Sequence, residues 1–229
     1  MAVSLFILVQ ERTFADALAI RLEREPDMDV VAALDISALP SRILVSSQVN
    51  AVLLDADLAD NAAFRLCQEL RQAPDAPYVI FLGHPSDAEC IVRAIRAGAA
   101  GWVRKDESLA RLIYVIRGVA RGETWLPPEQ TGEVLRLLMH GPDRDEDGNL
   151  PLAALTGRER EVLLCLAEGN RRRDVAEHLH MSPNTVRTHL QNLMAKLGVH
   201  SALEAVALTW RVGDEDFAPN DDWCAERGA

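Results

Sequence analysis

The amino-acid sequence predicts an α/β domain with a doubly wound, five-stranded parallel sheet, followed by an all-α domain of four helices. In the first half of the chain, five short apolar runs alternate with amphipathic stretches, which is the pattern of repeated βα units. Each run is apolar almost throughout, as strands buried on both faces of a parallel sheet must be. The segment from 155 to 212, by contrast, has only helical periodicity.

Each apolar run is expected to form a strand, and each amphipathic stretch after it a helix. The strands are expected at 4–9, 29–34, 51–55, 78–82 and 101–104, and the helices at 12–24, in a weaker stretch broken by Pro40, and at 61–73, 86–97 and 109–121. Gly98 and Gly122 follow the last two helices as stop signals. Five such units favour an open sheet over an eight-unit barrel, and in an open sheet the functional crevice lies beyond the carboxyl ends of the strands.

Residues 141–149 contain no large apolar side chain and are expected to form a solvated linker between the domains. The chain is therefore divided into an α/β domain at 1–124, a helix and acidic linker at 125–150, a helical domain at 151–212 and an acidic tail at 213–229. One more helix is expected at 129–140. The tail is expected to be disordered; the alternative is that its acidic side chains mimic DNA phosphates and fold over the basic face of the helical domain.

Composition and charge narrow the function. The chain of 229 residues is 48% hydrophobic and 26% charged, which excludes wholesale disorder and fibrous repeats. With 24 basic and 35 acidic residues its net charge is −11, so it is not a polycation that coats nucleic acid or membrane indiscriminately. The segment 151–212, with 8 basic and 6 acidic residues, is the only positive one, and any contact with nucleic acid is expected there.

Neither the cysteines nor the N-terminus indicate export. The four cysteines form no C-x-x-C pair and are too few for a disulfide framework, so they are expected to be free thiols in a reducing compartment. The opening apolar run is too short to span a bilayer and has no basic residues before it. We therefore expect a cytoplasmic protein without a membrane partner. No P-loop, nucleophile–base set or metal-ligand signature is present, so neither an enzyme nor a cofactor is expected.

The helical domain carries start signals for its helices. The stretch TGRE at 156–159 has the form of a capping box before an apolar helical run. A second helix is expected at 172–180, a third at 183–197, capped by Ser182 with Pro183 at its first position, and a fourth at 201–211. Two short helices joined by a tight turn indicate a helix-turn-helix.

The third helix is predicted to be amphipathic. Its apolar positions are Val186, Leu190, Leu193 and Leu197, whereas its other face carries Asn184, Arg187, Thr188 and Gln191. These polar side-chain types can reach base edges in the major groove of double-stranded DNA. At the start of the preceding helix, Arg171, Arg172 and Arg173 can contact phosphates. His178, His180 and His189 have no acidic or cysteine partner at ligand spacing and are not expected to bind metal.

The stretches LTGREREVLLCLAEGN and DVAEHLHMSPNTVRTHLQNLMAKLGV closely resemble the LuxR-type helix-turn-helix over about 60 residues. The resemblance implies that Arg187, Thr188 and Gln191 face the groove, and that Thr185, Lys196 and the arginine run contact the DNA backbone. It also implies that the fourth helix pairs in a two-fold dimer, either a homodimer or a heterodimer with a related regulator. The three consecutive arginines depart from the smaller polar residue usual at that helix start, which weakens capping but adds positive charge.

The α/β domain resembles the receiver domain of NarL-type response regulators over about residues 3–122, best in the stretches AIRAGAAGWVRKDES and VIRGVARGETWLPPE. In that family an aspartate after the third strand accepts a phosphoryl group. An acidic pair after the first strand helps this aspartate to hold Mg²⁺. A hydroxyl after the fourth strand and a lysine after the fifth neutralise the phosphoryl oxygens, and an aromatic residue three positions before the lysine reports the change.

In this chain the matching positions depart from that pattern. They hold Gln10 and Glu11 for the acidic pair, Asp55 for the acceptor, Gly83 for the hydroxyl, Trp102 for the aromatic residue and Lys105 for the lysine. One metal ligand and the hydroxyl are therefore missing, which should weaken Mg²⁺ binding considerably. We expect Asp55 and Lys105 to form a static ion pair in an atypical receiver that is not controlled by ordinary Mg²⁺-dependent phosphorylation.

Several alternatives stay open at this point. The chain could be a conventional response regulator phosphorylated on Asp55, with Asp57 or Asp60 as a substitute ligand, or a non-DNA adaptor acting through its receiver. If phosphorylation is not the input, a small molecule could bind in the crevice around Asp55, Gly83 and Lys105. A partner could instead dock on the face formed by residues 100–122, where Trp102 and Tyr114 are either exposed or buried in packing.

Overall fold

A computed structural model describes residues 2–34, 49–71, 76–84, 88–139 and 151–212 of the chain. The chain separates into two compact units, Met1–Val134 and Leu135–Ala229, which are described one at a time. The helix predicted around Pro40, the whole linker predicted at 141–149 and the whole C-terminal tail lie outside the described residues.

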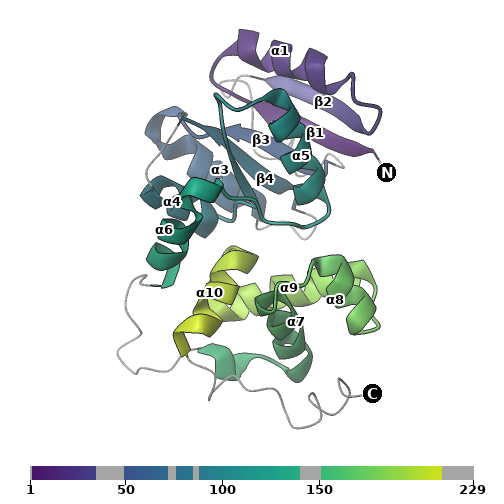
Figure 1. Ribbon diagram of the computed structural model, residues 1–229, viewed down its shortest axis with the longest axis vertical. Coiled ribbons are helices and arrows are strands. Elements are labelled where there is room, and N and C mark those ends of the chain that lie inside the picture. Colours follow the sequence, from purple (N-terminus) through teal and green to yellow (C-terminus); the bar gives the residue numbers. More distant parts are fainter. Residues whose placement is uncertain (1, 35–48, 72–75, 85–87, 140–150, 213–229) are drawn as a thin grey trace. The chain divides into compact units, whose positions relative to one another are not determined.

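The first unit is built on a five-stranded parallel sheet with the order β2-β1-β3-β4-β5 (Figure 1). The strands are β1 (Val3–Leu8), β2 (Met28–Leu34), β3 (Ala51–Asp55), β4 (Tyr78–Gly83) and β5 (Gly101–Arg104). All five residues of β3 are buried, and the central strands exclude water on both faces. This confirms the predicted doubly wound sheet. The strands are almost entirely apolar, so both faces of the sheet must be shielded from water, and helices on both sides provide this.

Helices cover both faces of this sheet. They are α1 (Arg12–Leu22), α3 (Ala62–Arg71), α4 (Ala88–Arg96) and α5 (Leu109–Ala120), and α6 (Pro128–Met139) follows. One apolar cluster joins α1 and α5 to β-strand side chains such as Leu5, Leu53 and Val103. The helix bounds differ from the predicted ones by up to two residues: α1, for example, ends at Leu22, and the stretch after β3 begins with a 3₁₀ turn over Ala59–Asn61.

The second unit consists of α7 (Gly157–Ala167), α8 (Arg172–His178), α9 (Pro183–Leu197) and α10 (Ala202–Val212), preceded by a 3₁₀ turn at Pro151–Ala154. A single apolar cluster, which includes Val162, Val175 and Leu190, joins the helices. This confirms the predicted four-helix domain. The second helix is shorter than predicted, because His180 adopts a left-handed backbone conformation with φ of 52° that α-helices do not tolerate.

The predicted helix signals of this unit have the expected geometry. The Thr156 backbone N–H donates to Glu159 Oε2 at 2.8 Å, and the Glu159 N–H donates to Thr156 Oγ1, which completes the capping box. Ser182 Oγ accepts the Thr185 N–H at 3.1 Å, with Pro183 at the first position of α9. At the start of α8, Asp174 Oδ2 accepts the Arg171 N–H at 3.2 Å, so an acidic residue inside the helix compensates for the poor arginine cap.

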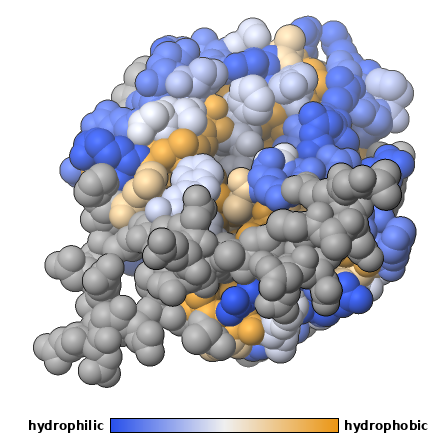
Figure 2. Space-filling view, turned by 60° about the horizontal axis from the view of Figure 1, so that its bottom comes forward, coloured by the Kyte–Doolittle hydropathy of each residue, from blue (hydrophilic) through white to orange (hydrophobic). Residues whose placement is uncertain are grey.

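On the face drawn in Figure 2, hydrophilic side chains make up most of the described surface, and hydrophobic ones show in smaller patches between them. Within the described ranges, no helix combines the length and the apolar character needed to cross a bilayer.

Candidate functional site

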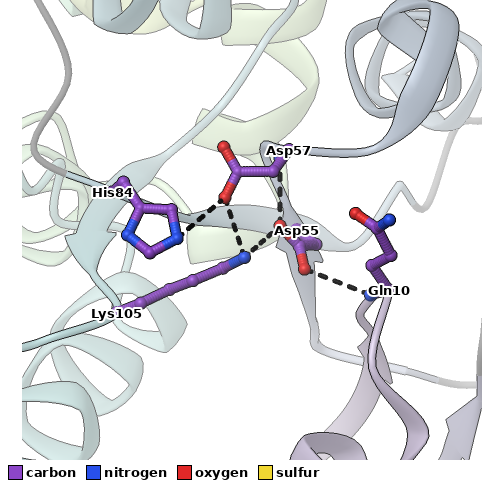
Figure 3. Close-up of polar contacts among 5 residues, drawn as sticks. All are labelled: Gln10, Asp55, Asp57, His84 and Lys105. Carbon is purple, nitrogen blue, oxygen red and sulfur yellow. Dashed lines mark hydrogen bonds and ion pairs between the residues drawn. The ribbon is translucent and has the colours of Figure 1, made fainter.

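A cluster of charged side chains lies where β3, β4 and β5 end (Figure 3). The Lys105 ammonium lies 2.7 Å from Asp55 Oδ1 and 2.8 Å from Asp57 Oδ2. The expected ion pair between Asp55 and Lys105 is therefore present, and Asp57 joins it as a second carboxylate. His84, which follows β4 directly, has its Nε2 3.7 Å from Asp57 Oδ2.

Asp55 is 2% exposed, and both of its carboxylate oxygens accept hydrogen bonds. Oδ1 accepts the Lys105 ammonium and the Asp57 backbone N–H at 3.0 Å, and Oδ2 accepts the Gln10 backbone N–H at 3.1 Å. The buried negative charge is thus balanced by one cation and two backbone dipoles, as a buried carboxylate requires. Burial alone would lower the pKa of Lys105, but its hydrogen bonds to Asp55 and Asp57 outweigh burial and raise that pKa.

These residues do not fit the Mg²⁺ site of the receiver family. Gln10 contributes only its backbone N–H to Asp55, and Glu11 is exposed. Both oxygens of Asp55 already hold protein donors, so the carboxylate has no oxygen left without one. In the part of the chain that the structure describes, no three His, Cys, Asp or Glu side chains are grouped as metal ligands, and this includes His178, His180 and His189.

The missing hydroxyl at Gly83 has a structural counterpart in Trp102. The Trp102 side chain is buried, with 1% exposure, and a Cβ atom placed on Gly83 would lie only 2.4 Å from Trp102 Cζ2. The indole ring therefore occupies the space that a serine or threonine side chain would need. It also stacks on Phe81, with 5.8 Å between ring centroids and an interplanar angle of 5°, and Phe81 stacks in turn on Phe64.

This packing decides between the two readings of the 100–122 face. Trp102 is part of the core and is not available to a partner, whereas Tyr114 is 52% exposed. Tyr114 meets the edge of Trp125, whose ring also lies 4.3 Å from the Arg111 guanidinium carbon. The face thus presents a tyrosine and an arginine-covered tryptophan, but not Trp102.

In the helical unit, α9 has the predicted two faces. Val186, Leu190 and Leu193 are buried. On the other side Asn184, Thr185 and Thr188 are exposed, and Arg187 and Gln191 are partly exposed. Ahead of α9, Arg171 and Arg173 are exposed and Arg172 is partly so, and Arg173 forms an i,i+4 pair with Glu177 at 3.1 Å.

Lys196 has a partner within the domain that the sequence did not reveal. Its ammonium lies 2.6 Å from Oε2 of Glu159, a carboxylate that is 3% exposed and belongs to the capping box of α7. Burial would raise the pKa of Glu159, but hydrogen bonds from Lys196 and Thr156 outweigh it and place the pKa below its usual value. The ion pair between Lys196 and Glu159 therefore joins the end of α9 to the start of α7.

We expect Lys196→Met to destabilise the helical unit at pH 7 by about 1–3 kcal/mol, because it leaves the Glu159 carboxylate buried without its cation. The folded-state pKa of Glu159 lies below the ordinary value of about 4.3. Its contribution to the free energy of unfolding is therefore present above that value and is lost as the pH falls through the folded pKa. Urea unfolding at neutral and acidic pH should show the difference between variant and parent shrinking in acid.

Arg158→Met is the matched control, since Arg158 is 60% exposed and pairs with Glu161, which is 34% exposed and keeps contact with water when its partner is lost. It should change stability little at either pH. Equal effects of the two substitutions, or a Lys196→Met effect that persists unchanged in acid, would contradict the assignment.

Comparison with known proteins agrees with this geometry. The response regulator receiver domain family matches residues 6–117, and the luxR family of bacterial regulatory proteins matches residues 153–209, which together make up about three quarters of the chain. The chain is 29% identical to the transcriptional regulatory protein LiaR of Bacillus subtilis, over 85% of this chain and 90% of LiaR. It is 27% identical to the DNA-binding transcriptional activator DevR/DosR of Mycobacterium tuberculosis, over 89% and 92%.

Among solved structures, two RcsB dimers bound to two parallel DNAs match with a TM-score of 0.52 at 17% identity, over 93% of this chain and all of that one. At this identity the likeness supports the fold alone. Because the family matches place a receiver and a LuxR-family domain in one chain, in the order that the fold shows, the protein belongs to the LuxR-type DNA-binding response regulators.

Proposed function

We propose that this response regulator controls transcription as a two-fold dimer on DNA, and that its receiver works independently of Mg²⁺-dependent phosphorylation of Asp55. The proposal that the receiver works without phosphorylation rests on the environment of Asp55. This carboxylate is buried, and its two oxygens already accept hydrogen bonds from three protein donors. Trp102 supports it, since its ring occupies the space of the missing hydroxyl beside Gly83.

The DNA contacts are assigned to α9 and to the arginines before it. Arg187, Thr188 and Gln191 lie on the solvent side of a 15-residue helix whose opposite side is buried, which suits a helix that enters the major groove. Asn184, exposed in the first turn of α9, is grouped with these base-reading side chains. Thr185 and the run Arg171, Arg172 and Arg173 are assigned to phosphates, which position the protein without reading sequence. Lys196 adds little here, because Glu159 neutralises its charge.

The two-fold dimer is assigned to α10. Trp210 on this helix is 47% exposed, an unusual place for a large indole in a monomer. Exposed tryptophans are common anchors of protein–protein interfaces. A dimer formed there would hold two copies of α9, which predicts an operator with two half-sites about one helical turn apart.

The proposed independence from phosphorylation is tested by incubating the full chain with acetyl phosphate and Mg²⁺ and measuring the mass of the intact protein by mass spectrometry. We expect no gain of a phosphoryl group, because one metal ligand and the hydroxyl are missing and both oxygens of Asp55 already accept protein donors. Asp55→Asn is the control, and parent and variant should have unchanged masses. A stoichiometric gain in the parent that Asp55→Asn abolishes would show a conventional response regulator.

The proposed binding to DNA is tested by selecting DNA fragments from a random pool with the unmodified protein and by footprinting the protein on the selected fragments. The proposal expects paired protected half-sites and an affinity that falls as salt rises. An adaptor that acts only through its receiver would select no sequence and leave no footprint.

A further inference from the structure

We infer that Asp57 is a built-in counter-anion for Lys105, and that its carboxylate occupies the place beside the ammonium that an oxyanion from solution, such as inorganic phosphate, would need. The inference rests on the proposed function, because it explains how the Lys105 charge is neutralised in a receiver that is not phosphorylated. It predicts that Lys105 does not bind oxyanions in the native chain and does so once the Asp57 charge is removed.

The geometry around the Lys105 ammonium supports this assignment. An ammonium group has three donors; two of them point to Asp55 Oδ1 at 2.7 Å and Asp57 Oδ2 at 2.8 Å. The Lys105 side chain is only 18% exposed, and Asp55 on its inner side is 2% exposed. Asp57 is 41% exposed, so it is the carboxylate that stands between the ammonium and solvent. Figure 3 shows the Asp57 carboxylate beside the Lys105 ammonium, so an oxyanion that approaches this ammonium encounters the negative charge of Asp57.

Asp57 is held in this position by the backbone. Its own N–H donates to Asp55 Oδ1 at 3.0 Å, a local turn two residues long that fixes where its side chain begins. The carboxylate is therefore aligned with the ammonium before any ligand arrives. Such a fixed intramolecular anion has a large advantage over a free one, which must lose translational freedom on binding.

The charges of the cluster act in the same direction. Asp55 and Asp57 outnumber the single ammonium of Lys105, and the His84 imidazole near Asp57 carries a charge only when protonated. A free oxyanion is therefore repelled from this cluster of side chains in the native chain. Asp57→Asn removes one negative charge but keeps the backbone N–H that bonds to Asp55, so the cluster becomes neutral and the outer side of Lys105 becomes open to an anion.

The lysine content of the chain makes the test specific. Lys105 and Lys196 are its only lysines, and they lie in different units. In full-length protein with ¹³C-labelled lysine, two side-chain signals are therefore expected, and Lys196 serves as the internal reference. We expect Asp57→Asn to move the Lys105 signal and leave Lys196 in place. Added inorganic phosphate should then shift Lys105 saturably in the variant, with a Kd of about 1 mM, and bind the parent at least about tenfold more weakly.

Asp16→Asn is the matched control, because Asp16 is an exposed carboxylate of the same unit that pairs only loosely with Arg12, at 4.0 Å. It should behave as the parent does. Asp57→Ser removes the same charge with a different shape and should reproduce the gain in phosphate binding. Phosphate binding that is as tight in the parent as in Asp57→Asn, or Lys105 signals unmoved by both Asp57 substitutions, would overturn the inference.

The DNA footprint separates this inference from the proposed function. If the unmodified parent leaves no footprint while Lys105 responds as expected, the proposed function fails and the counter-anion stands. If the footprint is present and Lys105 does not respond to loss of Asp57, only the counter-anion is wrong.

Discussion

Gly83→Ala is expected to destabilise the receiver unit by about 1–3 kcal/mol, although it adds one methyl group. Gly83 is not among the glycines with positive φ, so its backbone conformation would accept alanine. The cost comes from space, since the new Cβ would lie 2.4 Å from Trp102 Cζ2, in a ring that is buried and stacked on Phe81. Either the indole or strand β4 must shift to relieve the overlap.

Urea unfolding of the full chain measures this cost, and two further variants identify its source. Gly101→Ala is the control, because a Cβ there would meet its nearest atom, on Val119, at 3.4 Å, within ordinary packing distance. Trp102→Phe removes the part of the indole that contains Cζ2. Gly83→Ala should therefore cost much less in the Trp102→Phe background than alone. Simple additivity of the two substitutions, or equal costs at Gly83 and Gly101, would disprove the packing argument.

The second large effect is expected on DNA. Arg187→Ala combined with Gln191→Ala should weaken binding to the selected operator by about 100-fold or more, because each base contact contributes about 1–3 kcal/mol of discrimination. Binding to unrelated DNA should change much less, so the ratio between the two affinities should collapse. Neither side chain is fully buried, and the double variant should fold normally. Anisotropy titrations with labelled operator and scrambled DNA at one fixed salt concentration measure both affinities.

Two single variants show what kind of contact is lost. Arg173→Ala should weaken binding to both DNAs alike, as expected for a phosphate contact. It should also reduce the slope of log K against log salt concentration by about one unit. Arg12→Ala, an exposed arginine of the other unit, should change neither affinity. If the Arg187 and Gln191 variant lost both DNAs equally, α9 would hold the DNA backbone and would not read the bases.

Much of the fold could be predicted because the signals are local. The short apolar run Ala51–Leu54, which ends in Asp55, favours a buried strand by its length, and it forms β3 with the predicted bounds. Ser182 and Pro183 fix the start of α9, and Gly198, with φ of 67°, fixes its end. The end of α8 was placed two residues too late, because the left-handed conformation of His180 follows from how the turn packs and not from an evident local signal.

The candidate site was only partly predictable, because its decisive contacts join residues far apart in the chain. The sequence indicated that Gly83 lacks a hydroxyl, but it did not show that Trp102 fills the space. The available signal was the side-chain period of two, which places both residues on one face of adjacent strands once β4 and β5 are paired. For Asp57 and His84 the signal was weaker: both follow strand ends, where side chains from parallel strands gather.

Both lysines of the chain pair with a carboxylate that is almost fully buried, Lys105 with Asp55 and Lys196 with Glu159. Acylation of either ε-amino group would remove a cation and leave a buried carboxylate without its partner, so each ion pair is expected to slow the reaction of its lysine. The Lys105 side chain is 18% exposed and that of Lys196 is 36% exposed, so Lys105 is expected to react more slowly. Reaction rates at the two positions, followed by peptide mass spectrometry, would therefore report how firmly each ion pair holds, in the receiver and in the helix-turn-helix separately, within one intact molecule.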